Sequence, residues 1–316
     1  MRRLPAVSFA LFLVGSACGD ADGSPTGVTA VAGVYPLAWV AEQVAPDIEV
    51  ALLAAGGLQA HDLEITPGQR QAIQSSDVVL YVGEIGYQAH VESAVAAAEG
   101  EVVSLSEVAG RERLLEPGVD PYAHDDGQER GEGYDDHAGE GDAAVDPHIW
   151  FDPEVMADVA VRTGEAFAAA DPANAETYQQ HAAALGEDLV SLQGELDDLL
   201  GGECRHEEAI VSHQAYGYLL EPYGHSQHGV TGTNPEAGAS GAQLGRMVED
   251  IERHGFEYIL AEPVEGRQDA ETVAREAGVE LLEISPLDAV TDDQAEKGFP
   301  NLVRDQAAQF ARALGC

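Results

Sequence analysis

Short apolar runs alternate with amphipathic stretches over the first third of the chain. Strands that alternate with helices at this spacing form βαβ units, and such units build a parallel sheet. The predicted strands are 28–34, 48–53, 77–82 and 101–105, and the predicted helices are 35–45, 69–74 and 91–98. The pattern therefore predicts an α/β lobe over residues 27–170.

The same alternation returns toward the end of the chain. The predicted strands are 209–211, 258–260 and 280–284, the predicted helices 244–254, 269–277 and 301–314, and a turn-rich stretch covers 229–241. Residues 203–316 therefore predict a second α/β lobe. With 316 residues, the chain is long enough for two domains, each with its own core.

A helical period separates the two predicted lobes. Apolar residues recur at steps of three, four and seven, which is typical of an amphipathic helix; they are Tyr178, Leu185, Leu189, Leu192, Leu196 and Leu199. Pro172 suits a first helical turn, and Gly201 and Gly202 suit its end. We expect one long helix over 171–202. Since a single such segment is evident, a helix linking the lobes is favoured over a coiled-coil arm.

Periodicity is absent between Asp120 and Asp146. This stretch holds ten carboxylates, one arginine and two histidines, His124 and His137, among glycines. A segment so polar cannot bury an apolar core, so we expect a disordered acidic loop over 120–146 within the first lobe. We favour a solvated loop that raises the local cation concentration over one that captures metal directly.

The N-terminus has the pattern of an export signal. Two arginines precede an apolar stretch too short to span a membrane as a stable helix, and small residues lead to Cys18. We expect residues 1–17 to be a signal peptide and Cys18 a lipidated residue that anchors the protein on the extracytoplasmic side of the membrane. Gly15 stands where the cleavage motif usually has an aliphatic residue. Residues 18–26 then form a polar tether.

Charge narrows the classes of partner. The chain has 57 acidic and 15 basic residues, a formal net charge of -42, and Lys297 is its only lysine. So acidic a protein is excluded as a nucleic-acid binder. We expect a salt-adapted, halophilic acidic surface, with a cation-collecting surface as the alternative.

Three histidines stand in comparable settings. His61 follows Gly57-Leu58-Gln59-Ala60, His148 lies within Asp146-Pro147-His148-Ile149-Trp150-Phe151-Asp152-Pro153, and His213 lies within Val211-Ser212-His213-Gln214. Each follows an apolar run and precedes a turn or helix. Neutral imidazole is the commonest transition-metal ligand, so the three predict a zinc site that forms when the chain folds.

Together these segments resemble the metal-binding, solute-binding lipoproteins of bacterial ABC importers for zinc and manganese. The most specific matches are 146–153 and 212–218, and the stretch from His61 to Glu64 matches more loosely. The resemblance covers nearly the whole mature chain. It implies two α/β lobes, each with a mostly parallel sheet flanked by helices, joined by one long spine helix. It further implies a monomer that carries Zn²⁺ between the lobes to a membrane permease.

The resemblance also bears on which metal binds. Manganese-preferring relatives tend to hold a carboxylate where this chain has His213, and imidazole suits zinc better, so zinc is favoured over manganese. Relatives often place an Asp-Pro pair after the late strand, where this chain has Ser285-Pro286. The fourth ligand is therefore left open between Glu262, Asp288 and water.

Two cysteines remain once Cys18 is assigned to lipid. In the oxidising compartment of an exported protein, Cys204 and Cys316 favour a disulfide, and relatives with a cysteine pair in this lobe support it. Two free thiols are the alternative. His225 and His228, three residues apart, could make an accessory metal site.

Two other functional classes compete with transport. Three histidines around zinc with an open position also suit a hydrolytic enzyme, but the chain shows no His-Glu-x-x-His or Gly-x-Ser-x-Gly motif. Surface lipoproteins of this family are also proposed as cell adhesins, and no sequence feature supports that role. We therefore expect a transport protein and no enzyme.

Overall fold

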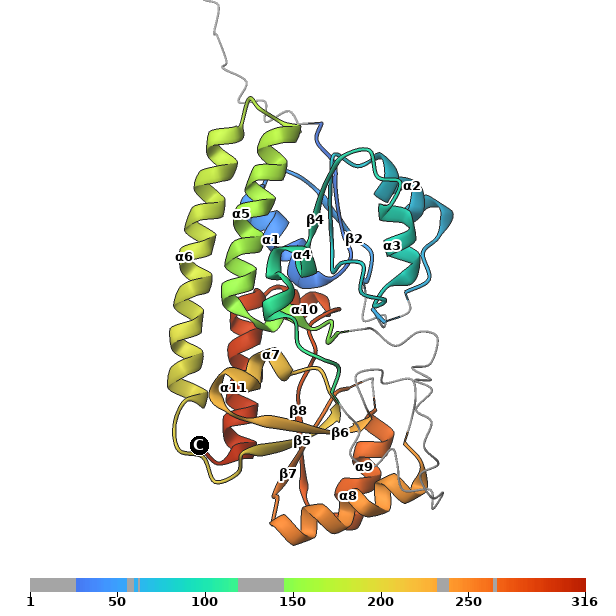
Figure 1. Ribbon diagram of the computed structural model, residues 1–316, viewed down its shortest axis with the longest axis vertical. Helices are drawn as coiled ribbons and strands as arrows, with labels where there is room; N and C mark the ends of the chain where they lie inside the picture. The colour runs from blue at the N-terminus through green and yellow to red at the C-terminus, as the bar shows by residue number, and fades with distance from the viewer. Residues whose placement is uncertain (1–26, 56–59, 62, 119–144, 232–238, 264–265) are drawn as a thin grey trace, which may run out of the picture.

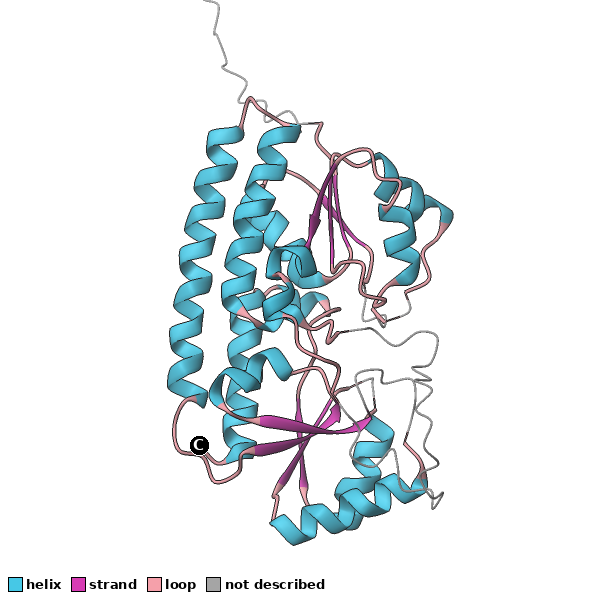
Figure 2. Cartoon of the chain, in the orientation of Figure 1, coloured by secondary structure: helices cyan, strands magenta, loops and turns pink. Residues whose placement is uncertain are grey.

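Two parallel sheets form two lobes stacked along the long axis of the molecule (Figure 1, Figure 2). The computed structural model describes residues 27–55, 60–61, 63–118, 145–231, 239–263 and 266–316. Both sheets have four strands flanked by helices, which confirms the predicted fold class. No helix among these residues is both long and apolar enough to cross a membrane.

The N-terminal sheet has the strand order β2-β1-β3-β4. Its strands are β1 (Ala30–Ala32), β2 (Val50–Leu52), β3 (Val78–Tyr81) and β4 (Glu101–Ser104). The two central strands, β1 and β3, are fully buried, as expected for a parallel sheet covered on both faces. The helices of this lobe are α1 (Tyr35–Val44), α2 (Pro67–Ser75), α3 (Ala89–Val95) and α4 (Leu105–Ala109), and the short helices η1 (Arg111–Arg113) and η2 (Ile149–Phe151) follow.

The C-terminal sheet has the order β6-β5-β7-β8. Its strands are β5 (Glu208–His213), β6 (Ser226–Thr231), β7 (Tyr258–Ala261) and β8 (Glu280–Glu283). Its helices are α7 (Gly217–Leu220), η3 (Glu221–Tyr223), α8 (Gly241–His254), α9 (Arg267–Ala277), α10 (Asp292–Ala295) and α11 (Phe299–Leu314). The prediction of a turn-rich stretch from residue 229 missed β6, whose polar sequence becomes a strand by pairing with β5.

A long helix lies along one side of both lobes, and a second long helix packs against it beside the first lobe (Figure 1). The predicted helix over 171–202 is α6 (Ala175–Leu200), and α5 (Pro153–Ala170), which the sequence analysis did not predict, packs against it. α5 lies within the first predicted lobe, and α6 contacts both α1 of the first lobe and α11 of the second, as expected of the predicted linking helix. Pro172 lies in the turn between the helices rather than in a first helical turn, where the Asp171 carboxylate accepts hydrogen bonds from Ala173 N, Asn174 Nδ2 and the Tyr178 hydroxyl.

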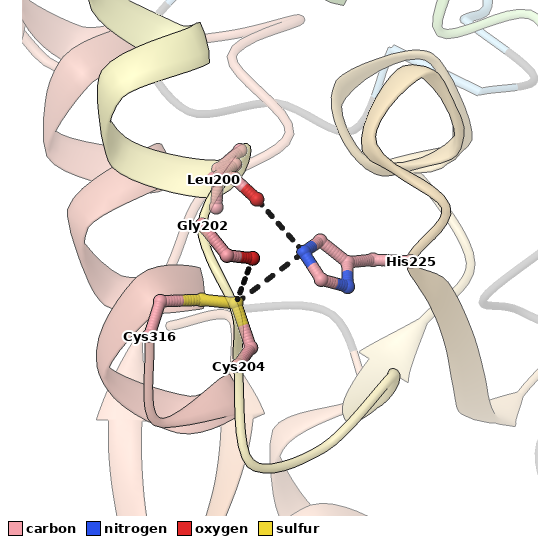
Figure 3. Close-up of a disulfide and its surroundings, with 5 residues drawn as sticks. All are labelled: Leu200, Gly202, Cys204, His225 and Cys316. Atoms are coloured by element: carbon pink, nitrogen blue, oxygen red, sulfur yellow. Dashed lines mark hydrogen bonds between the residues drawn. A yellow bond between two sulfur atoms is a disulfide. The ribbon is translucent and has the colours of Figure 1, made fainter.

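The predicted disulfide joins Cys204 to Cys316, with an S–S distance of 2.09 Å (Figure 3). It links the segment before β5 to the residue that follows α11. His225 lies beside it and donates a hydrogen bond from Nε2 to the carbonyl oxygen of Leu200 at 2.9 Å. No cluster of three potential metal ligands among the described residues contains both His225 and His228, so their accessory site gains no support.

The residues predicted to form the signal peptide, the lipidation site and the tether lie outside the described residues, as does the predicted acidic loop except for its last two positions. The last of these, Asp146, is buried at 2% exposure and belongs to the site described next.

Candidate metal centre

The fold brings His61, His148 and His213 together between the two lobes. His61 follows the loop after β2, His148 immediately precedes η2, and His213 is the last residue of β5. Their exposed fractions are 8%, 0% and 0%. The ring centroids are 5.4 Å apart for His61–His148, 5.9 Å for His61–His213 and 5.4 Å for His148–His213. One ligand nitrogen from each lies within 4.8 Å of the other two, which is the spacing of a shared metal site.

Asp146 fixes the orientation of His148. Its Oδ1 accepts hydrogen bonds from the backbone N of His148 at 3.0 Å and from Nδ1 of the ring at 2.8 Å. The Tyr218 hydroxyl donates to the Asp146 carbonyl at 3.1 Å and holds this turn in place. A carboxylate behind one imidazole nitrogen leaves the other free to bind metal, and Nε2 of His148 is buried without a hydrogen-bond partner.

Glu262 stands behind His213 in the same way. Its Oε1 lies 2.8 Å from His213 Nδ1 and accepts a hydrogen bond from the Tyr216 hydroxyl at 2.9 Å. The backbone N of Glu262 donates to Ser212 Oγ at 3.2 Å, which ties the residue after β7 to β5. Oε2 of Glu262 is buried without a partner, but the carboxylate lies outside the group of mutually close ligand atoms. This geometry favours an outer, orienting role for Glu262.

Asp288 approaches the histidines from the turn after β8. Its Oδ2 accepts a hydrogen bond from the Tyr87 hydroxyl at 3.1 Å, and its Oδ1 accepts one from Ala289 N at 2.8 Å. Complete burial raises the pKa of Asp288, while the nearby His148 ring opposes this shift. Asp288 therefore faces the cluster, although its oxygens also lie outside the group of three.

The turn that presents Asp288 has an unusual backbone. Leu287 has φ 65°, the only positive φ at a non-glycine residue in the described structure, and is fully buried. Such a conformation costs on the order of 1–3 kcal/mol and persists where the surroundings impose it. Ser285 Oγ accepts a hydrogen bond from Leu287 N at 3.3 Å, and the Pro286 carbonyl accepts one from Trp150 Nε1 at 2.7 Å. Ser285 thus shapes the turn that points Asp288 inward.

Aromatic rings close the space around the histidines. Tyr87 lies edge-on to His61 with 4.6 Å between centroids, and Trp150 lies 5.3 Å from His148. Trp150 is fully buried. The other tryptophan, Trp39, packs on Phe299 at 5.8 Å. The sequence analysis gave Tyr87 no role, because no motif marks it.

Burial lowers the pKa of His61 well below its ordinary value, and the neighbouring rings of His148 and His213 lower it further. Protonating His61 would place a charge in a buried site beside two other imidazole rings. His61 is therefore neutral at neutral pH, which is the form that binds metal.

This pKa predicts how the stability of the metal-free protein depends on pH. The unfolded chain binds a proton at His61 below about pH 6.5, whereas the folded protein does not, so stability falls as pH drops from about 6.5 toward the lower pKa of the folded state. We expect urea unfolding in the presence of a chelator to show this loss. The variant His61→Asn should lose part of the pH slope, and the exposed control His254→Asn should keep it. Equal slopes in all three proteins would contradict the prediction.

A family model described as zinc-uptake complex component A, periplasmic (ZnuA), matches residues 30–313. The chain belongs to the ZnuA family. The match spans both lobes and includes all three histidines.

Curated relatives of this ZnuA-family chain include two zinc proteins. It is 29% identical over 291 residues to the zinc-binding lipoprotein AdcA of Streptococcus pneumoniae, covering 92% of this chain and 55% of the relative. It is 28% identical over 306 residues to the high-affinity zinc uptake system protein ZnuA of Bacillus subtilis, covering 92% and 90%. The chain thus spans about half the length of the AdcA relatives it matches.

A solved structure supports the fold of the ZnuA-family chain. The Zn(II)-bound ZnuA-like domain of Streptococcus pneumoniae AdcA superposes with a TM-score of 0.71 at 22% identity, covering 92% of this chain and 99% of that domain. At this level of identity the likeness shows the shared two-lobe architecture.

Proposed function

We propose that this chain is an extracytoplasmic binding protein that takes up one Zn²⁺ between its lobes and delivers it to the permease of an ABC importer. The observation that carries this proposal is the convergence of three buried imidazoles, two from the first lobe and one from the second. Because ligands come from both lobes, a bound ion would bridge the lobes. The zinc-binding relatives support the same function.

The donor set favours zinc. In this proposal His61, His148 and His213 are the metal ligands, and Asp288 is the fourth. Nε2 of His61 and of His148 are buried without hydrogen-bond partners, a costly arrangement for two polar atoms unless a cation binds them. Three imidazoles with one carboxylate suit zinc better than manganese, which prefers oxygen-rich sites.

Export and anchoring complete the proposal. We place a signal peptide at residues 1–17, a lipid on Cys18 and a tether to residue 26, followed by two lobes joined by α6. A lipoprotein among the relatives supports this placement. The protein would act as a monomer beside its permease. The decisive test is the metal content of protein purified without added metal, together with zinc-limited growth of a deletion strain. Metal-free protein and unchanged growth would refute the function.

The fourth ligand can be tested with two matched variants. We expect Asp288→Asn to weaken zinc binding more than Glu262→Gln, because Asp288 would contact the ion whereas Glu262 orients His213. Loss of an outer partner typically costs about 10–100-fold in metal affinity. Competition titration against a chromophoric chelator measures both variants, with circular dichroism as the check on folding. A larger loss in Glu262→Gln would show that Glu262 is the ligand.

A further inference from the structure

A second group of metal-ligating side chains lies at the far end of the C-terminal lobe. Cys204, His225 and Cys316 place one ligand atom each within 4.8 Å of the others (Figure 3). In the described structure the two sulfurs are joined as a disulfide. We propose that when a dithiol reductant opens this disulfide, the three side chains form a Cys₂His site for Zn²⁺, separate from the histidine centre and independent of the function proposed above.

The distances already approach those of a tetrahedral zinc site. Zn–S bonds of about 2.3 Å and Zn–N bonds of about 2.0 Å at tetrahedral angles place sulfur and nitrogen about 3.5 Å apart and two sulfurs about 3.8 Å apart. Cys204 Sγ lies 3.5 Å from His225 Nε2, so this pair needs almost no movement. The sulfurs must separate from 2.09 Å to the thiolate spacing.

Cys316 is free to make that movement. It is exposed and lies beyond the end of α11, which closes at Gly315 in the left-handed conformation. Its backbone N donates a hydrogen bond to Ala311 O at 3.0 Å, but no strand or helix continues through it. Cys204 and His225, in contrast, are held in place, since Cys204 packs against the core and His225 is 7% exposed.

The surroundings favour a cation. Nε2 of His225 lies 2.9 Å from the carbonyl oxygen of Leu200, the last residue of α6, and Cys204 Sγ lies 3.5 Å from the Gly202 carbonyl oxygen. The negative end of a 26-residue helix therefore faces the group, which stabilises a bound cation and disfavours bare thiolates. Binding through Nε2 would move the ring proton to Nδ1, which is buried without a hydrogen-bond partner, so the metal must offset the lost hydrogen bond to Leu200.

Opening the disulfide and forming the zinc site require only the dithiol and the Zn²⁺ ion. The reductant forms a disulfide between its own two sulfurs, and its two electrons and two protons pass to Cys204 and Cys316. Zn²⁺ then displaces one proton from each thiol to solvent, and the Nε2 proton of His225 moves to Nδ1 as Nε2 binds. Water completes the tetrahedron. The metal replaces the disulfide as the link between the end of the chain and the start of the second lobe.

Metal titrations of oxidised and reduced protein test the proposal. We expect oxidised protein to bind one equivalent of Zn²⁺, and protein that was reduced with a dithiol and then separated from it under anaerobic conditions to bind two. Co²⁺ should give a sulfur-to-cobalt charge-transfer band in the near ultraviolet only after reduction. His225→Phe should weaken the second equivalent at least tenfold and Cys204→Ser should abolish the band, while His254→Ala, a histidine exposed in the same lobe, should leave both unchanged.

A variant of the histidine centre distinguishes metal binding there from metal binding at the Cys₂His site. His148→Ala should lose the first equivalent and keep the sulfur-to-cobalt band after reduction. Reduced protein that stays folded by circular dichroism and shows no such band would overturn the proposal. If reduction unfolds the chain, recovery of the fold on adding Zn²⁺ supports the site, and failure to recover overturns it.

Discussion

Replacing His148 with alanine is expected to reduce zinc affinity by orders of magnitude. A site with four ligands binds zinc with about 10–16 kcal/mol, so one ligand accounts for roughly 3 kcal/mol, which is more than a hundredfold in Kd. His148 is fully buried and oriented by Asp146, so no other side chain can take its place without moving the turn before η2. Competition titration against a high-affinity chelator measures the loss.

A second substitution of His148, closer in volume to histidine, separates the loss of a ligand from the loss of packing. Alanine leaves a cavity beside Trp150, so His148→Asn serves as a second variant with a smaller packing defect. The control is His254→Ala on the surface of α8. If all three proteins bound zinc as tightly as the parent, the histidine centre would not be the zinc site.

Removing the disulfide is expected to have the largest effect on stability. The double variant Cys204→Ser/Cys316→Ser should lose about 2–5 kcal/mol in free energy of unfolding, because the bond closes a long loop that the unfolded chain would otherwise explore. The cysteines are 112 residues apart in the sequence. Urea unfolding of metal-free protein measures the loss.

Zinc affinity should change little in that double variant. Cys204 precedes β5 and His213 ends it, so the length of a six-residue strand, about 20 Å, separates the disulfide from the metal centre. If the double variant had the same free energy of unfolding as the parent, the disulfide would not stabilise the protein by restricting the unfolded chain. A parallel loss of zinc affinity would show that the bond shapes the metal centre.

The sequence predicted the three histidines because each is part of a local motif. It could not separate the roles of Glu262 and Asp288. That distinction depends on which carboxylate lies behind an imidazole and which faces the cluster, and both follow from the packing of β7 and the turn after β8. Asp288 points inward through the positive φ of Leu287, a conformation for which a leucine gives no sequence signal.

Secondary structure was predicted best where apolar periodicity was strong. The buried strands β1 and β3 and the helix α6 follow such patterns. β6 was missed because Ser226, Gln227 and His228 are poor strand formers, and their strand exists through pairing with β5. α5 was missed although Asp152 and Pro153 carry a helix-start signal: the Asp152 carboxylate accepts hydrogen bonds from Glu154 N and Val155 N.

The long helix α6 restricts how the two lobes can move relative to each other. α6 is a continuous helix of 26 residues, about 39 Å long, and it contacts α1 of the first lobe and α11 of the second. Two lobes fastened along one stiff helix resist swinging apart as they would about a flexible linker, because opening would require bending α6 or breaking its contacts with α1 or α11. We therefore expect the release of the ion to depend on breaking local contacts at the centre, such as the hydrogen bond from Tyr87 to Asp288.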